Sequence, residues 1–181
     1  MNAIILKLKN IFILFLALCG CAQVTEEESM DLSPYEEEHA ILIGDVIANA
    51  KEHYECQHQA GGASISLCLM PALEIPQQEV VFLSENQHAH VTIKNRGDGN
   101  LRIDNMLWSV PSVIVPANAE SQRYFDAFAQ HKRIYIAPEY AMELELMIAP
   151  SHNTFHGENL LSIKNNDPQS ANESMTFVVP E

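Results

Sequence analysis

From Ala72 to the C-terminus, short apolar runs alternate with turn residues at regular spacing. Strands with one buried side alternate apolar and polar residues, so this pattern is typical of an antiparallel β-sandwich. Roughly seven or eight strands fit in about 110 residues, a normal size for such a domain. The predicted strands are Glu79–Leu83, His88–Lys94, Leu101–Ile103 with Met106–Trp108, Arg133–Ile136, Met142–Ile148, Leu160–Lys164 and Met175–Val179.

Two turn segments separate pairs of these runs. The segment Asn95–Gly99 contains two glycines, which permit positive φ angles, so we expect a tight hairpin there. Asn166-Asp167-Pro168 is also a turn, because the two polar side chains can bond nearby backbone amides and the proline fixes φ. On both sides of the first turn, alternate residues are predicted to face the core: Val91, Ile93, Leu101 and Ile103.

The same two segments resemble signatures of a known domain family. Val91–Ile103 is similar to the V-x-I/L-x-N-x-G-x-G-x-L-x-I hairpin of ASH-type (abnormal-spindle and Hydin-like) Ig domains, and Leu161–Pro168 resembles their closing L-x-I-x-S/T-N-D-P segment. The resemblance covers residues 72–180 and implies an Ig-like sandwich that contacts proteins and has no catalytic residues. The sequence departs from the family at the long segment Ser109–Lys132, and at Pro138-Glu139-Tyr140, where many members have a P-G-E/Q turn.

The first 21 residues have the charge and hydropathy order of a secretory signal. Lys7 and Lys9 precede the apolar run Ile11–Leu18, which is too short for a good membrane-spanning helix. The residues Leu18-Cys19-Gly20-Cys21 resemble the bacterial lipobox, which implies cleavage after residue 20 and a lipid on Cys21; the alternative is an ordinary signal peptide or an uncleaved anchor. Ala22 differs from the aspartate of inner-membrane retention signals, so we expect the outer membrane, facing the periplasm or the cell surface.

The expected mature chain is strongly acidic. Without residues 1–20 it keeps eight basic and 24 acidic residues, a net charge of −16. Such a chain repels phosphate backbones, so we expect no nucleic-acid binding. We interpret residues 21–33 as the lipidated cysteine and a solvated linker, although a sorting tag or weak divalent-cation binding is an alternative. The acidic side chains after the anchor are Glu26, Glu27, Glu28, Asp31, Glu36, Glu37 and Glu38.

Residues 34–71 are predicted to be a helical segment with a cysteine loop. Ser33-Pro34-Tyr35-Glu36 has the pattern of a capping box, and mixed helical spacing follows it, so one N-terminal α-helix is expected over residues 34–54. Cys56 and Cys68 are the two cysteines outside the signal and the anchor. In an oxidising compartment such a pair is most simply a disulfide.

The sequence shows no motif of a known catalytic class, so we expect neither an enzyme nor a cofactor. His88 and His90 lie two apart on a predicted strand, so their side chains share a face and could chelate copper or zinc. Glu143 and Glu145 also share a strand face, which we interpret as the solvated side of a sheet.

Arginine and aromatic residues gather in the long segment Ser109–Lys132. Because such residues often anchor protein interfaces, we predict a partner-binding site there, with core packing as the alternative for the neighbouring Trp108. The predicted function is a lipid-anchored cell-envelope protein that acts as a non-enzymatic protein-binding or structural module, with another envelope or surface protein as its partner. The alternative is a periplasmic metal-binding lipoprotein. The predicted binding residues are Arg123, Tyr124, Phe125 and Phe128.

Overall fold

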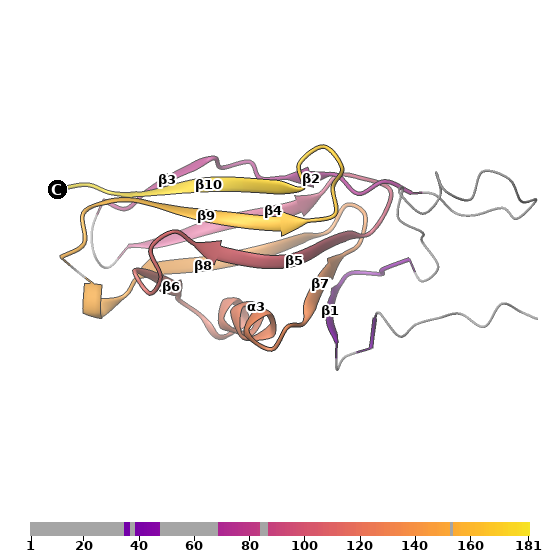
Figure 1. The fold of residues 1–181 in the computed structure, drawn as a ribbon, viewed down its shortest axis with the longest axis horizontal. Coiled ribbons are helices and arrows are strands. Elements are labelled where there is room, and N and C mark those ends of the chain that lie inside the picture. Colours follow the sequence, from indigo (N-terminus) through magenta and orange to yellow (C-terminus); the bar gives the residue numbers. More distant parts are fainter. Residues whose placement is uncertain (1–34, 37–38, 48–68, 84–86, 153) are drawn as a thin grey trace, which may run out of the picture. The chain divides into compact units, whose positions relative to one another are not determined.

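Two β-sheets stack face to face in the structure (Figure 1). The computed structural model describes residues 35–36, 39–47, 69–83, 87–152 and 154–181, all within the compact unit Asp31–Glu181. Cys21, Cys56 and Cys68 therefore lie outside the described residues. The described elements are β1 (Ala40–Ile43), β2 (Leu73–Glu74), β3 (Glu79–Val81), β4 (His88–Asn95), β5 (Leu101–Trp108), β6 (Ile114–Pro116), α3 (Ala119–Ala129), β7 (Arg133–Ile136), β8 (Ala141–Ile148), the 3-10 turn η2 (Pro150–His152), β9 (Gly157–Asn165) and β10 (Asn172–Val179).

The six-stranded sheet has the order β1-β7-β5-β9-β10-β3, and the four-stranded sheet has the order β2-β4-β8-β6. Every run predicted as a strand overlaps one of these strands, which confirms the mainly β, Ig-like sandwich. Most neighbours are antiparallel, including the β9–β10 hairpin, whereas the edge strands β1 and β3 run parallel to β7 and β10. In the part of the chain that is described, no helix is long and apolar enough to cross a membrane.

The core lies between the two sheets. Every second residue of β4 and of β9 is buried, as the alternation predicted. The ring of Phe177 lies against those of Phe82 and Trp108, with centroid distances of 6.2 and 5.0 Å. Trp108 thus packs on the core, the alternative considered for it. The residues predicted to face the core are all 0% exposed: Val91, Ile93, Leu101 and Ile103.

The predicted hairpin at Asn95–Gly99 is wrong, because β4 and β5 belong to opposite sheets. The connection crosses from one sheet to the other, so the two strands face each other through their buried side chains rather than through backbone hydrogen bonds. Neither Gly97 nor Gly99 has a positive φ. Each lies against the backbone of residues 69–72, where a Cβ atom would overlap main-chain atoms. The glycines are needed for close packing of two chain segments.

The helix predicted over residues 34–54 is also wrong for the residues that the structure describes, which form one turn and then β1. The amides of His39 and Ala40 donate to the carbonyl of Glu36, and the chain then pairs with β7. Gly44 follows β1 with a φ of 75°, and the ring of Tyr140 occupies the space of a side chain there. The capping residues thus supply a single turn, because pairing with β7 and burial of Ala40 hold the next residues extended.

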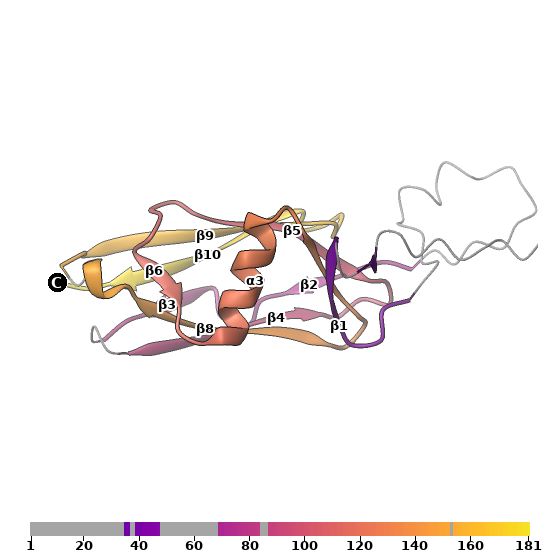
Figure 2. The ribbon, with the colours of Figure 1, turned by 90° about the horizontal axis from the view of Figure 1, so that it is seen from below.

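The segment Ser109–Lys132, where the sequence departs from the family pattern, contains β6 and α3. Asn118 caps the helix, because its side chain accepts a hydrogen bond of 2.8 Å from the amide of Ser121. The helix contacts strands of both sheets, and Figure 2 shows it lying across the open side between them. It therefore closes one side of the core.

Candidate functional site

The outer face of the four-stranded sheet is polar. His88 Nδ1 lies 2.6 Å from Glu145 Oε1, and the Thr92 hydroxyl donates a 2.7 Å hydrogen bond to Glu143. The hydrogen bonds from His88 and Asn118 hold the pKa of Glu145 below its ordinary value. These side chains form hydrogen bonds with one another across the strands on the solvent side of the sheet. This agrees with the interpretation of the two glutamates as lying on a solvated face.

His88 and His90 lie on this face and are both exposed, as predicted from their spacing. Within the ranges that the structure describes, however, no group of three or more His, Cys, Asp or Glu residues could hold a metal ion. A site for zinc or copper needs at least a third protein ligand in most cases. The histidine pair therefore stays a prediction, and the described geometry does not favour it.

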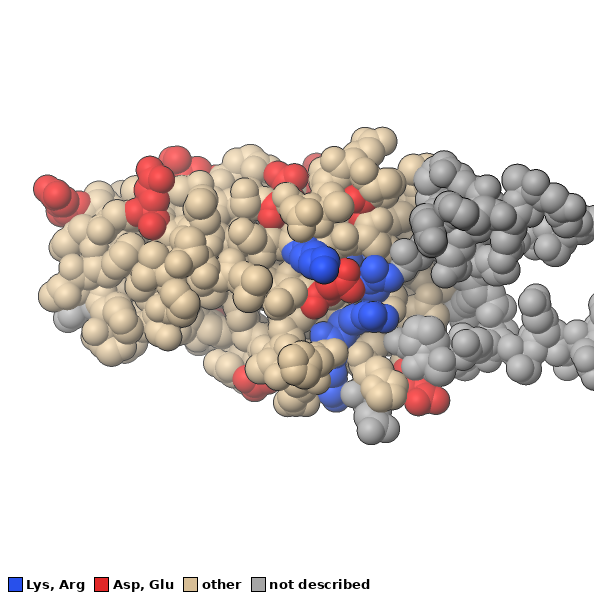
Figure 3. Space-filling view, in the orientation of Figure 1, with Lys and Arg blue, Asp and Glu red and all other residues tan. Residues whose placement is uncertain are grey.

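The outer face of the six-stranded sheet is different, and we call its exposed part the apolar face. It carries Leu107 on β5, Leu160 on β9, Val178 on β10 and Val81 on β3. Leu107, Leu160 and Val81 are 60%, 42% and 38% exposed. Leu107 lies opposite Ser162, next to Leu160, and Val178 lies opposite Val81. The two pairs meet diagonally, because Leu160 lies opposite Thr176, two residues before Val178 on β10. Figure 3 shows a broad uncharged area on this side of the molecule.

Opposite charges lie at the two ends of the apolar face (Figure 3). At one end, the Arg102 guanidinium lies 2.8 Å from Asp104, Arg133 lies 3.6 Å from the same carboxylate, and Lys164 lies opposite Asn105 on the neighbouring strand. Within the described residues, three cationic side chains share this one carboxylate, so this end is basic. At the other end, Glu158 is the second residue of β9, and exposed Glu181 follows β10.

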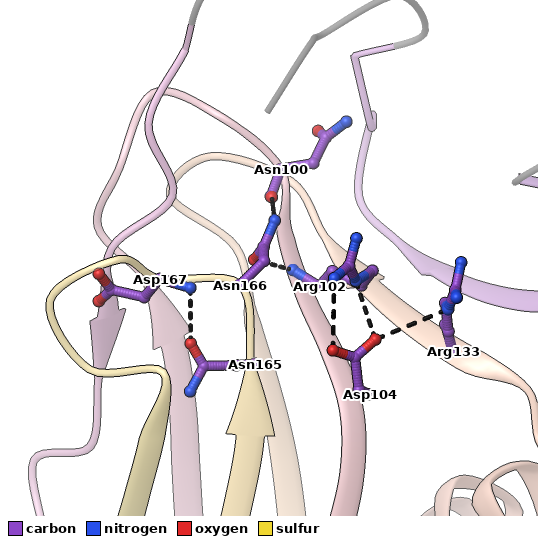
Figure 4. Close-up of polar contacts among 7 residues, drawn as sticks. All are labelled: Asn100, Arg102, Asp104, Arg133, Asn165, Asn166 and Asp167. Atoms are coloured by element: carbon purple, nitrogen blue, oxygen red, sulfur yellow. Dashed lines mark hydrogen bonds and ion pairs between the residues drawn. The ribbon is translucent and has the colours of Figure 1, made fainter. Parts of the chain in front are cut away.

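The basic end is held by a network of amide side chains (Figure 4). Asn166 accepts a 2.7 Å hydrogen bond from the amide of Arg102 and donates one of 3.2 Å to the carbonyl of Asn100. Asn165 accepts from the amide of Asp167 at 2.7 Å, which confirms the predicted turn. The aspartate in turn accepts from the amide of Leu73 at 2.8 Å. This network ties β5 to the β9–β10 turn and fixes the backbone beneath the arginines.

The predicted partner-binding residues on α3 are mostly packing residues. Tyr124 is only 5% exposed, and its hydroxyl donates to Glu120 at 3.0 Å. Burial, with that hydrogen bond, raises the pKa of Tyr124 to about 12, so the hydroxyl stays protonated at neutral pH. Phe125 stacks on Trp108 with centroids 6.4 Å apart, and Phe128 is partly buried against the core. Tyr124 is therefore a packing residue, whereas partner binding through Phe125 and Phe128 stays a prediction.

Arg123 is the exposed member of the predicted set. It lines an open groove of about 390 Å³ between α3 and β1, together with Asp126 and Lys132. The walls of the groove are otherwise alanine, isoleucine and glutamine side chains. The groove is small and mixed in charge, so the apolar face is the stronger candidate for a protein contact.

Sequence reasoning missed the apolar face, although a signal for it is present. In Leu160-Leu161-Ser162-Ile163-Lys164, the buried residues are Leu161 and Ile163, so Leu160 takes an outward position that is usually polar. Leu107 takes the same kind of position on β5. Apolar residues at outward positions of two adjacent strands predict an exposed patch once the pairing is known.

No protein-family model matches the chain, and no curated protein sequence does. Among solved structures, a protein of unknown function from Porphyromonas gingivalis W83 gives a TM-score of 0.45 at 17% identity, over 67% of this chain and 51% of that one. The periplasmic chaperone SfaE gives 0.43 at 8% identity, over 60% and 56%. The ASH / PapD-like domain 7 of human CEP192 gives 0.42 at 6% identity, over 60% and 84%. The chain thus spans about half the length of the first two, and the likeness concerns the fold alone.

Proposed function

We propose that this chain is a non-enzymatic, lipid-anchored protein of the bacterial cell envelope, and that its sandwich binds a protein partner through the apolar face. The observation that carries the proposal is the contrast between the two outer faces. One face holds hydrogen-bonded polar pairs, and the other exposes Leu107, Leu160 and Val81. Contiguous exposed apolar patches are uncommon on soluble monomers, and they mark interaction surfaces.

The apolar face is suited to side-chain contacts on a rigid platform. Its central strand, β9, is paired on both sides, with β5 and with β10. The backbone groups are therefore already hydrogen-bonded, and a partner contacts the side chains rather than adding a strand. A preformed surface of this kind loses little conformational entropy when a partner binds.

The anchor is part of the proposal and rests on the sequence. The lipobox-like residues before Cys21 support lipid attachment, and the acidic residues after it would hold the sandwich away from an anionic membrane surface. With Ala22 after the cysteine, the outer membrane is favoured over the inner one. A tether of this kind gives the apolar face access to other envelope proteins.

We expect aspartate substitutions on the apolar face to remove partner binding. Burial of one leucine contributes about 1.5–3 kcal/mol, so the double variant Leu107→Asp, Leu160→Asp should weaken a contact through this face by more than about a hundredfold. The measurement is the set of proteins that co-purify with the anchored chain from its own envelope, compared quantitatively by mass spectrometry. Circular dichroism checks that the variant folds.

The matched control is Met147→Asp, an apolar-to-acidic change at an outward position of β8 on the polar face. It should leave the co-purifying proteins unchanged. Retention of every partner by the folded double variant would contradict the proposal, and so would equal losses in the variant and the control.

A further inference from the structure

We propose that the partner of the apolar face is a second copy of this chain, bound by face-to-face packing of the two six-stranded sheets about a two-fold axis. This inference rests on the proposed function, since it names the occupant of the same face. A two-fold contact requires a surface that is complementary to itself. If one residue of the first copy contacts a second residue of the other copy, the reverse contact is also present, so every contact occurs twice. The apolar face has this property along β9.

The self-complementarity is clearest for two charged residues. Glu158 and Lys164 both lie on the outer side of β9 and are exposed, and each is three residues from Leu161. The two-fold axis lies between the two sheets, perpendicular to β9 and level with Leu161. It therefore reverses the strand direction in the second copy. Glu158 of each copy then lies opposite Lys164 of the other, which gives two equivalent ion pairs. Within the described residues, neither side chain has an ion pair of its own.

The same axis brings apolar side chains together at the centre. Leu160 lies one residue from the axis, so it meets Ser162 of the second copy. Leu107 lies opposite Ser162 on the neighbouring strand, so the two leucines of different copies come into contact. Stacked sheets lie about 10 Å apart with interdigitated side chains, and the small serine leaves room for a leucine from the opposite sheet.

Charge selects this orientation over the alternative one. If the two copies packed with their strands in the same direction, the basic ends around Arg102 and Arg133 would meet each other, and so would the acidic ends around Glu158 and Glu181. The reversed arrangement places opposite ends together. The net charge of −16 on the expected mature chain opposes association at long range, but at physiological salt charges further apart than about 8 Å are largely screened. Association of the two copies and their relative orientation therefore depend on the contacts at the apolar centre and on the ion pairs at the two ends.

Charge reversal tests the arrangement in the full mature chain, purified in detergent, with sedimentation equilibrium as the readout. The parent should form dimers. Glu158→Lys alone and Lys164→Glu alone should each raise the dimer dissociation constant by about tenfold or more, because each places like charges together twice. The double variant Glu158→Lys, Lys164→Glu should restore the parent value, since it rebuilds both pairs in the opposite sense. Glu143→Lys on the polar face is the control and should have no effect.

A chain that remains monomeric over a wide range of concentration overturns the inference. So does a dimer that the single reversals leave unchanged, or one that the double reversal does not restore. These outcomes are distinct from failure of the proposed function. A monomeric chain that loses other envelope proteins through Leu107→Asp, Leu160→Asp still binds a partner through the apolar face, whereas a chain that binds neither itself nor another protein there refutes both.

Discussion

Replacing Asn95 with alanine is expected to lower the free energy of unfolding by about 3–5 kcal/mol, because it leaves several buried backbone groups unpaired at about 1–3 kcal/mol each. The side chain of Asn95 is 0% exposed. Its amide donates to the carbonyls of Gly99 at 2.7 Å and Ile136 at 2.9 Å. Its oxygen accepts from the amides of Gly97 at 3.0 Å and Ala72 at 3.3 Å. One residue thus joins the crossing between the sheets to β7 and to the segment before β2.

Urea unfolding followed by the fluorescence of Trp108 measures this effect. Asn105→Ala is the matched control, because Asn105 lies on β5 in the other sheet and is only partly buried, and its side-chain oxygen accepts from the adjacent amide of Met106. The control should cost about 1 kcal/mol or less. If the two variants unfold at the same urea concentration, the amide of Asn95 does not hold the crossing.

Cys21→Ser is expected to abolish lipid attachment completely, because the thiol is the acceptor that the lipobox resemblance implies. Without acyl chains, the protein should leave the membrane fraction, since each buried methylene contributes about 0.8 kcal/mol to anchoring. Metabolic labelling with a palmitate analogue, followed by membrane fractionation, measures both effects.

Cys19→Ser is the control for this change, because Cys19 lies in the signal that is expected to be removed. It should leave labelling intact. Equal labelling of Cys21→Ser and the parent would remove the anchor from the proposed function, although the apolar face would still require a partner.

The sandwich could be predicted from the sequence, because a strand with one buried side alternates apolar and polar residues whatever its neighbours are. The side chains of β4, β8 and β9 follow that rule closely. The crossing at Asn95–Gly99 could not be predicted, since a glycine-rich turn serves both a hairpin and a change of sheet. The packing of Gly97 and Gly99 on residues 69–72 decides between them, and that contact joins parts of the chain distant in sequence.

Two further differences have the same origin. Residues 40–43 become extended because β7 offers them an unpaired edge, which a capping box cannot reveal. Conversely, α3 has local signals that could have been used, since Asn118 is a good N-cap and the buried Ser121, Tyr124 and Ala127 follow at helical spacing. Interpreting the aromatic residues as surface anchors hid this spacing.

The turn at Pro138–Tyr140 shows how a departure from a family pattern can keep the backbone. Glu139 has a φ of 66°, the conformation for which the family's glycine is suited. Its amide donates to the carbonyl of Asn95, and its carboxylate lies 3.1 Å from the Lys94 ammonium. These contacts hold the left-handed conformation, so the turn between β7 and β8 forms without a glycine.

The candidate site was harder to predict than the fold, because exposure of one leucine has no meaning until its neighbours across the sheet are known. Leu107 and Leu160 are 53 positions apart in sequence, and only the pairing of β5 with β9 makes them one surface. Arg123 is exposed, and partner binding through it stays a prediction. The aromatic residues were required to attach α3 to the core.

The central claim is that the apolar face is the surface that contacts protein, and site-specific photo-crosslinking in the living envelope tests it most directly. A photoreactive amino acid is placed at position 160 on the apolar face or at position 92 on the polar face, and covalent adducts are identified by mass. We predict adducts from position 160 and none from position 92, with a product of twice the chain mass if the partner is a second copy. No adduct from position 160, or equal adducts from both positions, would contradict the account.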